Sequence, residues 1–146
     1  MRVYLAGPIA AVDDGGAAWR DQLVSDYPDI EWLNPLDQYN VPLDDLYIVD
    51  GPTEDESAVS VRELVEHDKR LLAKADGILA GYSDVQQIGT PMEVIAGWRD
   101  DIPVSMWVRD GTPLTDISPW YRYHCGQITS DRGLAVSFLE RRCGSE

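Results

Sequence analysis

Short apolar runs alternate with segments of helical periodicity along the chain, and this alternation constrains the fold more than any other feature of the sequence. The run at 2–6, for example, ends at the turn-forming pair Gly7-Pro8, which is typical of a strand. The next segment places Trp19 and Leu23 on one face at helical spacing. Strands that alternate with helices predict a parallel sheet with helices on both faces and right-handed crossovers.

We expect one domain, 1–146, because a length of 146 residues suits a single domain. The sheet is expected to hold four to five strands, at 2–6, 30–33, 77–82, 102–108 and, for a short last strand, 127–129. Helices are expected at 17–27, 57–75, 90–99 and 134–142. The stretch 34–56 is rich in Pro, Asp and Gly and predicts a long loop, and such loops in compact domains are often functional.

The charge balance excludes several classes of partner. Lys and Arg total 12 against 26 Asp and Glu, which gives a formal net charge of −14. Such a surface repels phosphate backbones and anionic lipid, so we expect neither a nucleic acid polymer nor a membrane as partner. The composition is typical of halophilic proteins, whose charge is screened in a salty cytoplasm. With 2 cysteines and no C-x-x-C pair, the sequence predicts a reduced, cytoplasmic protein.

Ligands of a parallel sheet bind outside the carboxyl ends of its strands. In this chain those places are Gly7-Pro8-Ile9 after the first strand, 34–37 after the second, 83–90 after the third, and the segment that follows Val108. We expect the functional residues to lie there.

Asp68 falls within an apolar stripe of the helix expected at 57–75. The other members of the stripe, at helical spacing, are Val61, Leu64, Val65, Leu71 and Leu72. A carboxylate on a core-facing stripe must be paired, neutralised or placed at a cavity. Two interpretations stay open: Asp68 pairs with Arg62 or with an end of the sheet, or it is a general acid or orienting group in a pocket that raises its pKa.

Glu93 ends the pattern Gly89-Thr90-Pro91-Met92-Glu93, which is typical of a helix start. Thr90 suits the N-cap and Pro91 the first helical position, so Glu93 falls at the spacing of a capping box. The alternative interpretation is functional. A Glu in the first helical turn lies near the positive end of the dipole, which favours its ionised form and would suit a nucleophile.

The segment 118–124 is dense in aromatic and polar side chains. Such a cluster can stack a flat ligand ring, or it can form a subunit interface or a lid. His67 and His124 form no constellation with the cysteines, so we expect no metal. The sequence contains no P-loop, no G-x-G-x-x-G and no G-x-S-x-G, so we expect neither a tightly bound nucleotide cofactor nor a hydrolase triad.

Together these segments resemble the nucleoside 2-deoxyribosyltransferase family. The opening Tyr4 to Ile9 is similar to the family's first strand and ligand loop, and Val41 to Tyr47 is similar to a stretch in some of its transferases. The block from Asp68 to Trp98, which includes Glu93, is the most specific match. The segment 118–124 is similar to a late element of related sequences.

The resemblance implies a flavodoxin-like or Rossmann-like three-layer fold, no cofactor and a homodimer or higher homo-oligomer whose neighbouring subunits complete the site. Glu93 would attack C1′ of a 2′-deoxyribosyl group to form a covalent ester, and Asp68 would help to move the proton of the departing base. A second base, or water, would then attack the same carbon, giving net retention. The substrate-binding residues that we expect are Tyr4, Gly7, Pro8, Ile9, Asp37, Gln87, Gly89, Met92, Asp116, Trp120 and His124.

Two positions depart from the family's pattern. Gln87 occupies the position where the transferases often carry Asp and where phosphate-recognising hydrolase relatives tend to carry Ser. Asp116 corresponds to an Asn that, in some transferases, lies late in the sequence and helps to hold the ligand. Three interpretations therefore stay open: a transferase that exchanges bases between nucleosides, an N-glycosidase that hydrolyses 2′-deoxynucleoside 5′-monophosphates, and a non-catalytic nucleotide-binding module. The hydrolase would need Arg20, or backbone amides near Gly7 or Gly89, to face a phosphate.

Overall fold

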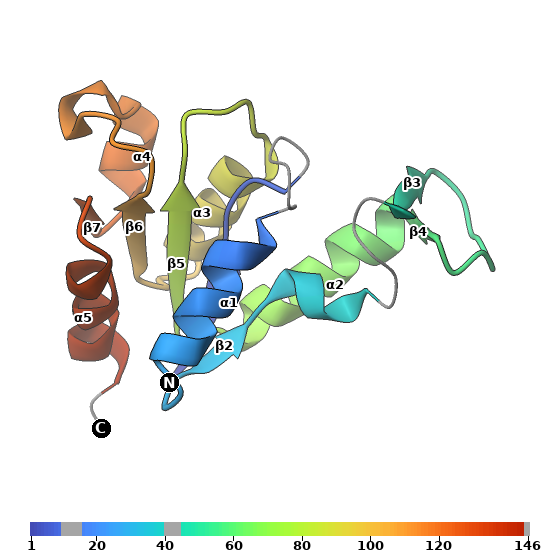
Figure 1. Cartoon of the computed structure of the whole chain (residues 1–146), viewed down its shortest axis with the longest axis horizontal. Helices are drawn as coiled ribbons and strands as arrows, with labels where there is room; N and C mark the ends of the chain where they lie inside the picture. The colour runs from blue at the N-terminus through green and yellow to red at the C-terminus, as the bar shows by residue number, and fades with distance from the viewer. Residues whose placement is uncertain (10–15, 40–44, 145–146) are drawn as a thin grey trace.

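The computed structural model describes residues 1–9, 16–39 and 45–144. Its main sheet has five parallel strands in the order β2-β1-β5-β6-β7 (Figure 1). These strands are β1 (Arg2–Ala6), β2 (Glu31–Leu33), β5 (Gly77–Tyr82), β6 (Val104–Val108) and β7 (Gln127–Thr129). The expected parallel sheet is therefore confirmed, including its short last strand.

Helices cover both faces of this sheet. They are α1 (Ala17–Asp26), α2 (Val61–Lys74), α3 (Gly89–Arg99), α4 (Pro119–His124) and α5 (Arg132–Cys143), with 3₁₀ turns η1 (Pro35–Gln38) and η3 (Leu114–Asp116). Within the described ranges, none of these helices is long and apolar enough to cross a membrane.

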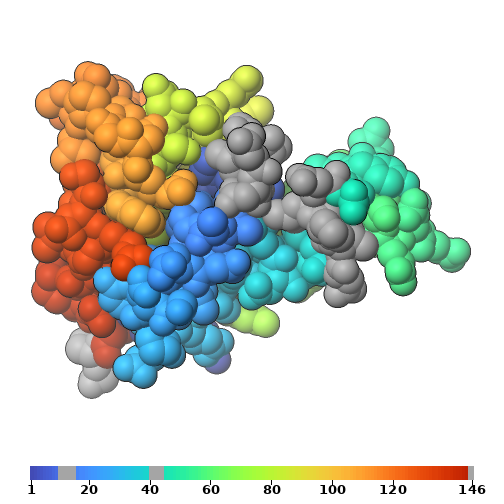
Figure 2. All heavy atoms as spheres, in the orientation of Figure 1, coloured from blue at the N-terminus to red at the C-terminus, as the bar shows by residue number. Residues whose placement is uncertain are grey.

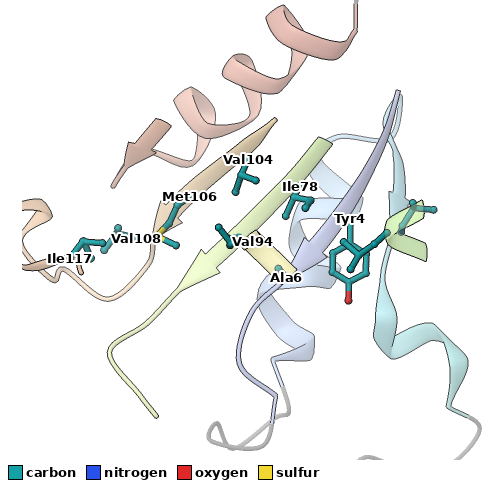
Figure 3. Close-up of a cluster of buried hydrophobic side chains, with 11 residues drawn as sticks. Tyr4, Ala6, Ile78, Val94, Val104, Met106, Val108 and Ile117 are labelled. Carbon is teal, nitrogen blue, oxygen red and sulfur yellow. The ribbon is translucent and has the colours of Figure 1, made fainter. Parts of the chain in front are cut away.

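Two buried clusters give the fold its three layers, because side chains alternate between the faces of a strand. On β1, Tyr4 and Ala6 face the cluster that also contains Leu72 of α2 and Val94 of α3 (Figure 3). The other cluster joins α1 and α5 to the opposite face of the sheet. Its members are Val3, Leu5, Trp19, Leu23, Ile30, Leu79, Ala135, Val136 and Leu139.

Helix α2 departs from expectation at its start. Residues 58–60 form β4 (Ala58–Ser60), which pairs with β3 (Tyr47–Val49) in a separate two-stranded parallel sheet, and the helix begins only at Val61. This small sheet and the first turns of α2 project beyond the main sheet (Figures 1 and 2). Val61 and Val65 are 43% and 42% exposed, so the expected core-facing stripe is wrong there. The main sheet simply does not extend beneath those turns.

The carboxyl ends of β1 and β5 lie side by side, because the two strands are neighbours in the sheet. Both ends pack against the same indole. A Cβ atom on Gly7 would lie 2.7 Å from Cζ2 of Trp19, and one on Gly81 would lie 2.6 Å from its Cη2. Only glycine lets Trp19 approach both strand ends this closely. Helices α2 and α3 flank β1 and β5 on the opposite face, and this edge is where ligands bind in such sheets.

Candidate active site

Side chains from three elements meet over β1. Tyr4, in the middle of that strand, is completely buried, and its hydroxyl donates a hydrogen bond to a carboxylate oxygen of Glu93 on α3. Figure 3 shows Tyr4 on the sheet face that carries Val94 of the same helix. Asp68 on α2 lies close enough for its charge to act on both Tyr4 and Glu93. The fold thus brings together the two carboxyl groups that the sequence analysis selected.

Helix α3 begins earlier than a capping box would allow. Its first residue is Gly89 and its N-cap is Ile88, with no side-chain capping bond, so the expected box between Thr90 and Glu93 is wrong. Thr90 lies instead with Val94 and Gly97 on the buried face of the helix. The hydroxyl of Thr90 therefore faces the interior, and Glu93 is free to receive the bond from β1 instead of bonding back to the helix start.

Desolvation dominates the ionisation of Glu93. Burial raises its pKa from the ordinary 4.5 to about 7, the hydrogen bond from Tyr4 lowers it, and the negative charge of Asp68 raises it. Glu93 is also the fifth residue of α3, so its expected place in the first turn of the helix is wrong. Burial, followed by the charge of Glu93, also raises the pKa of Tyr4 above its usual range, so its phenol stays protonated and acts as a donor.

Asp68 is partly buried and does not form its expected ion pair. Arg62 binds Glu66 on its own helix, with 2.8 Å between Nε and Oε2, so the interpretation that pairs Asp68 with Arg62 is wrong. The imidazole of His67 lies beside Asp68 instead, with 3.7 Å between its Nδ1 and Oδ1 of Asp68. Burial raises the pKa of Asp68, whereas His67 and Arg20 lower it. Both Glu93 and Asp68 thus hold protons more tightly than an exposed carboxyl group does.

Arg20 binds two backbone carbonyl groups, one just after β1 and one just before α1. It is completely buried on α1, and its two terminal nitrogens donate to the carbonyl oxygens of Gly7 at 3.1 Å and Gly16 at 3.0 Å. Its guanidinium also lies 4.6 Å from the ring centroid of Trp19. Arg20 therefore connects Gly7, which follows β1, to Gly16, which precedes α1. Pro8 is buried and Ile9 half-buried beside it, and the described part of the loop ends there.

Two hollows lie beside the helices that carry the carboxyl pair. One, of about 370 Å³, lies between α3 and α4 and is lined by Gln87, Trp120 and Tyr121 among others. Burial, followed by the charges of Cys125, Tyr82 and Glu93, raises the pKa of Tyr121 to about 12. The other, of about 420 Å³, lies beside α2 and includes Tyr39 and His67 in its wall. We call them the α3–α4 hollow and the α2 hollow.

The remaining expected site residues are exposed or have packing contacts of their own. Asp37 is exposed on η1, Asp116 is exposed on η3, and Met92 is 66% exposed. Gly89, also exposed, opens α3. His124 packs against the rings of Trp98, Trp120 and Tyr123, with centroid distances of 5.0, 5.9 and 4.8 Å. Of the stretch Val41 to Tyr47, only the last three residues belong to the described part of the chain.

Sequence reasoning missed three features of the site. The Tyr4–Glu93 bond could have been found, because a tyrosine at an inward-facing strand position needs a partner for its hydroxyl. The hydrogen bond from Arg20 to Gly7 and the proximity of His67 to Asp68 depend on tertiary packing, and no sequence pattern indicates them. Within the residues that the structure describes, no three His, Cys, Asp or Glu side chains gather as they would around a metal ion.

Comparisons with known proteins identify the fold. No protein-family model and no curated protein sequence matches the chain. The structure of a 2-deoxyribosyltransferase from the psychrotolerant bacterium Bacillus psychrosaccharolyticus matches it with a TM-score of 0.56 at 16% identity, over 92% of this chain and 96% of that one. The chain has the fold of a 2-deoxyribosyltransferase. A conserved protein from Enterococcus faecalis V583 matches with a TM-score of 0.68 at 14% identity, over 97% of this chain and 98% of that one.

The arrangement can support displacement chemistry at an electrophilic carbon. A carboxylate held by a phenol donor is an oriented nucleophile, and its charge stabilises a cationic centre in a site with little water. A second carboxyl group with a raised pKa can supply and recover a proton. Retaining glycosidases use two carboxyl groups in this way, one as the nucleophile and the other as the acid and base.

Proposed function

We propose that the chain is an enzyme of the nucleoside 2-deoxyribosyltransferase family, which cleaves the N-glycosidic bond of 2′-deoxynucleosides and passes the sugar to another base. The observation that carries the proposal is the hydrogen bond from Tyr4 to Glu93 with Asp68 beside it. It is supported by the fold that the chain shares with a 2-deoxyribosyltransferase.

The first step forms a covalent intermediate. Glu93, as a carboxylate, attacks C1′ of the deoxyribosyl group, and the bond from C1′ to the base nitrogen breaks with its electron pair on that nitrogen. Asp68, as a carboxylic acid, gives its proton to the departing base. The transition state resembles an oxocarbenium ion, which the nearby charge of Glu93 stabilises. Tyr4 fixes the direction of the attacking oxygen throughout.

The second step returns the enzyme to its starting state. A nitrogen of the entering base attacks C1′ of the ester, loses its proton to Asp68, and displaces Glu93 as a carboxylate. Each displacement inverts C1′, so the product retains the configuration of the substrate. With water as the acceptor, the same step would yield free deoxyribose.

The charges around the site favour an uncharged nucleoside over a 5′-monophosphate. A phosphate needs cations or helix N-terminal amides, and the candidate cation, Arg20, is completely buried and donates to two backbone carbonyls. The N-glycosidase of deoxynucleoside monophosphates therefore remains the second candidate. The interpretation as a binding module required Glu93 to cap α3, and that helix has no side-chain cap.

We further propose that the protein works as a homodimer or higher homo-oligomer. Large apolar side chains are exposed in two places, on the projecting β3–β4 sheet with the start of α2, and along α3 and α4. They include Tyr47, Ile48, Val61, Val65, Met92, Trp98, Trp120 and Tyr123. Clustered exposure of this kind marks interaction surfaces. A mass measured in solution as that of one chain at every concentration would contradict this proposal.

Chromatography tests the proposed reaction. The protein is mixed with deoxyinosine and adenine, and separately with deoxynucleoside monophosphates alone. We expect new deoxyadenosine in the first mixture and no free base in the second. Glu93→Gln should lower the exchange rate by about 10³-fold or more, whereas Glu140→Gln, an exposed glutamate on α5, should leave it unchanged. Normal exchange by Glu93→Gln would refute the assignment of the nucleophile.

A further inference from the structure

His67 and Asp68 are consecutive residues of α2 whose polar atoms face each other at the site. The Nδ1 atom of His67 lies 3.7 Å from Oδ1 of Asp68, just beyond hydrogen-bond length. Both atoms are buried, and neither has a hydrogen-bond partner within the described ranges. Buried polar atoms without partners are costly, so a small movement that closes this gap is favoured. Catalytic hydrogen bonds are often this long before a ligand binds.

His67 also borders one of the two hollows. It forms part of the wall of the α2 hollow, of about 420 Å³, and its side chain is 28% exposed. The residue therefore has Nδ1 near the buried carboxyl group and contributes to the wall of a hollow. Lys69, the other chain neighbour of Asp68, is exposed and forms no part of that wall.

Several other ionisable groups surround this pair. Glu63 and Arg70 on α2 and Glu56 before β4 line the same hollow as His67. Tyr39, which follows η1, also lines it, and burial, followed by the charge of Asp68, raises the pKa of its phenol to about 12. On the side of the sheet, Asp68 faces Tyr4 and Glu93, and the buried Arg20 acts on it from α1. None of these other groups forms a hydrogen bond with Nδ1 of His67 or Oδ1 of Asp68.

We propose that His67 is the positioning residue for Asp68, whose carboxylate it holds by donating a hydrogen bond from Nδ1 after Asp68 has given its proton to the departing base. The inference rests on the proposed function and adds a residue to it. The proton balance is unchanged: Asp68 loses one proton to the leaving nitrogen and regains one from the entering base, while His67 keeps its own. By stabilising the carboxylate, His67 makes Asp68 a stronger acid toward bases that leave poorly.

Carboxyl ¹³C NMR tests the contact without any activity. The resonance of Asp68 is assigned by its loss in Asp68→Asn and followed against pH. Removing a hydrogen-bond donor to a carboxylate raises the pKa of that carboxyl group, so we expect His67→Phe to raise the midpoint of Asp68 by about one pH unit. His67→Asn, which keeps an N–H group near the position of Nδ1, should raise it less. Lys69→Met removes a charge from the other neighbour of Asp68 and should shift the midpoint little.

Kinetics then tests the role in the reaction. Activity falls as pH rises through the pKa of an essential acid, so His67→Phe should move that falling limb upward by about one pH unit. Its rate should fall most for poorly leaving bases, and His67→Asn should restore part of the loss. A loss of structure alone would lower the rate at every pH without moving the limb.

The two measurements separate the possible failures. If the Asp68 midpoint moves in His67→Phe but the unaltered protein exchanges no bases, the contact stands and the proposed function fails. If the protein exchanges bases but His67→Phe and His67→Asn leave both the midpoint and the limb where they were, the inference about His67 is overturned. An equal shift in Lys69→Met would overturn it as well, because the effect would then not depend on contact.

Discussion

Glu93→Gln should stabilise the folded protein at neutral pH. Burial raises the pKa of Glu93 from 4.5 to about 7, so the folded chain keeps a proton that the unfolded chain has already lost in this interval. The contribution of such a group is fully present below the unfolded pKa and disappears as pH rises through the folded one. A shift of this size corresponds to about 3 kcal/mol of unfolding free energy. Glutamine carries no titratable proton, so the variant should not pay this cost.

Urea denaturation followed by tryptophan fluorescence measures the effect at about pH 5 and about pH 8. The free energy of unfolding should fall between the two pH values by about 2.5 kcal/mol more in the unaltered protein than in Glu93→Gln. Glu140→Gln, which changes an exposed glutamate on α5, should retain the full dependence. Equal dependence in Glu93→Gln and the unaltered protein would refute the argument that desolvation of this carboxyl group costs stability.

Three further predictions concern the surroundings of the pair. Tyr4→Phe removes a hydrogen bond worth about 1.5–3 kcal/mol to the ionised carboxylate, so the pKa of Glu93 should rise and the rising limb of base exchange against pH should move up by about one unit; an unmoved limb would contradict the assigned donor. Gly81→Ala places Cβ 2.6 Å from Trp19 and should lower the unfolding free energy by about 1–3 kcal/mol, which an unchanged urea midpoint would disprove. In Arg20→Lys, the lysine side chain cannot reach both carbonyl oxygens, so the unfolding free energy should fall by about 2 kcal/mol in urea denaturation. The same substitution at an exposed arginine is the control, and an equal loss there would contradict the role of Arg20.

The sheet could be predicted from the sequence because its strands are short apolar runs that end in turns. The run at 77–82, for example, became β5 with the same bounds. Burial on both faces imposes such runs, so the pattern is local and easily recognised. The order of the strands, β2-β1-β5-β6-β7, was not predicted from the sequence.

The errors arose where tertiary packing competes with a local rule. Thr90 had good capping chemistry, but the helix face that packs on the sheet also contains Val94 and Gly97, and this packing took Thr90 inside. Val61 and Val65 had helical spacing, but no sheet lies beneath them. Helix α4 was not predicted, although Ser118 caps it and Pro119 occupies its first position, because its aromatic residues are weak helix formers.

The site residues show the same difference between what local sequence patterns predict and what tertiary packing decides. Glu93 and Asp68 were selected as residue types at suggestive positions, and the fold brings both to Tyr4. Gln87 and Trp120 were expected to bind the substrate, and they line the α3–α4 hollow. Sequence spacing shows which strand end a residue follows, but not which side of a helix it occupies relative to a neighbouring element. That information comes only from packing.

One strand determines the separation of the two acids. Asp68 lies on the helix that leads into β5, and Glu93 lies on the helix that leaves it, so both are anchored to Gly77–Tyr82 and not to the margins of the sheet. The edge strands β2 and β7 lie farther from this anchor. Insertions or shortening at those two edges should therefore disturb the spacing of the pair less than changes in β5.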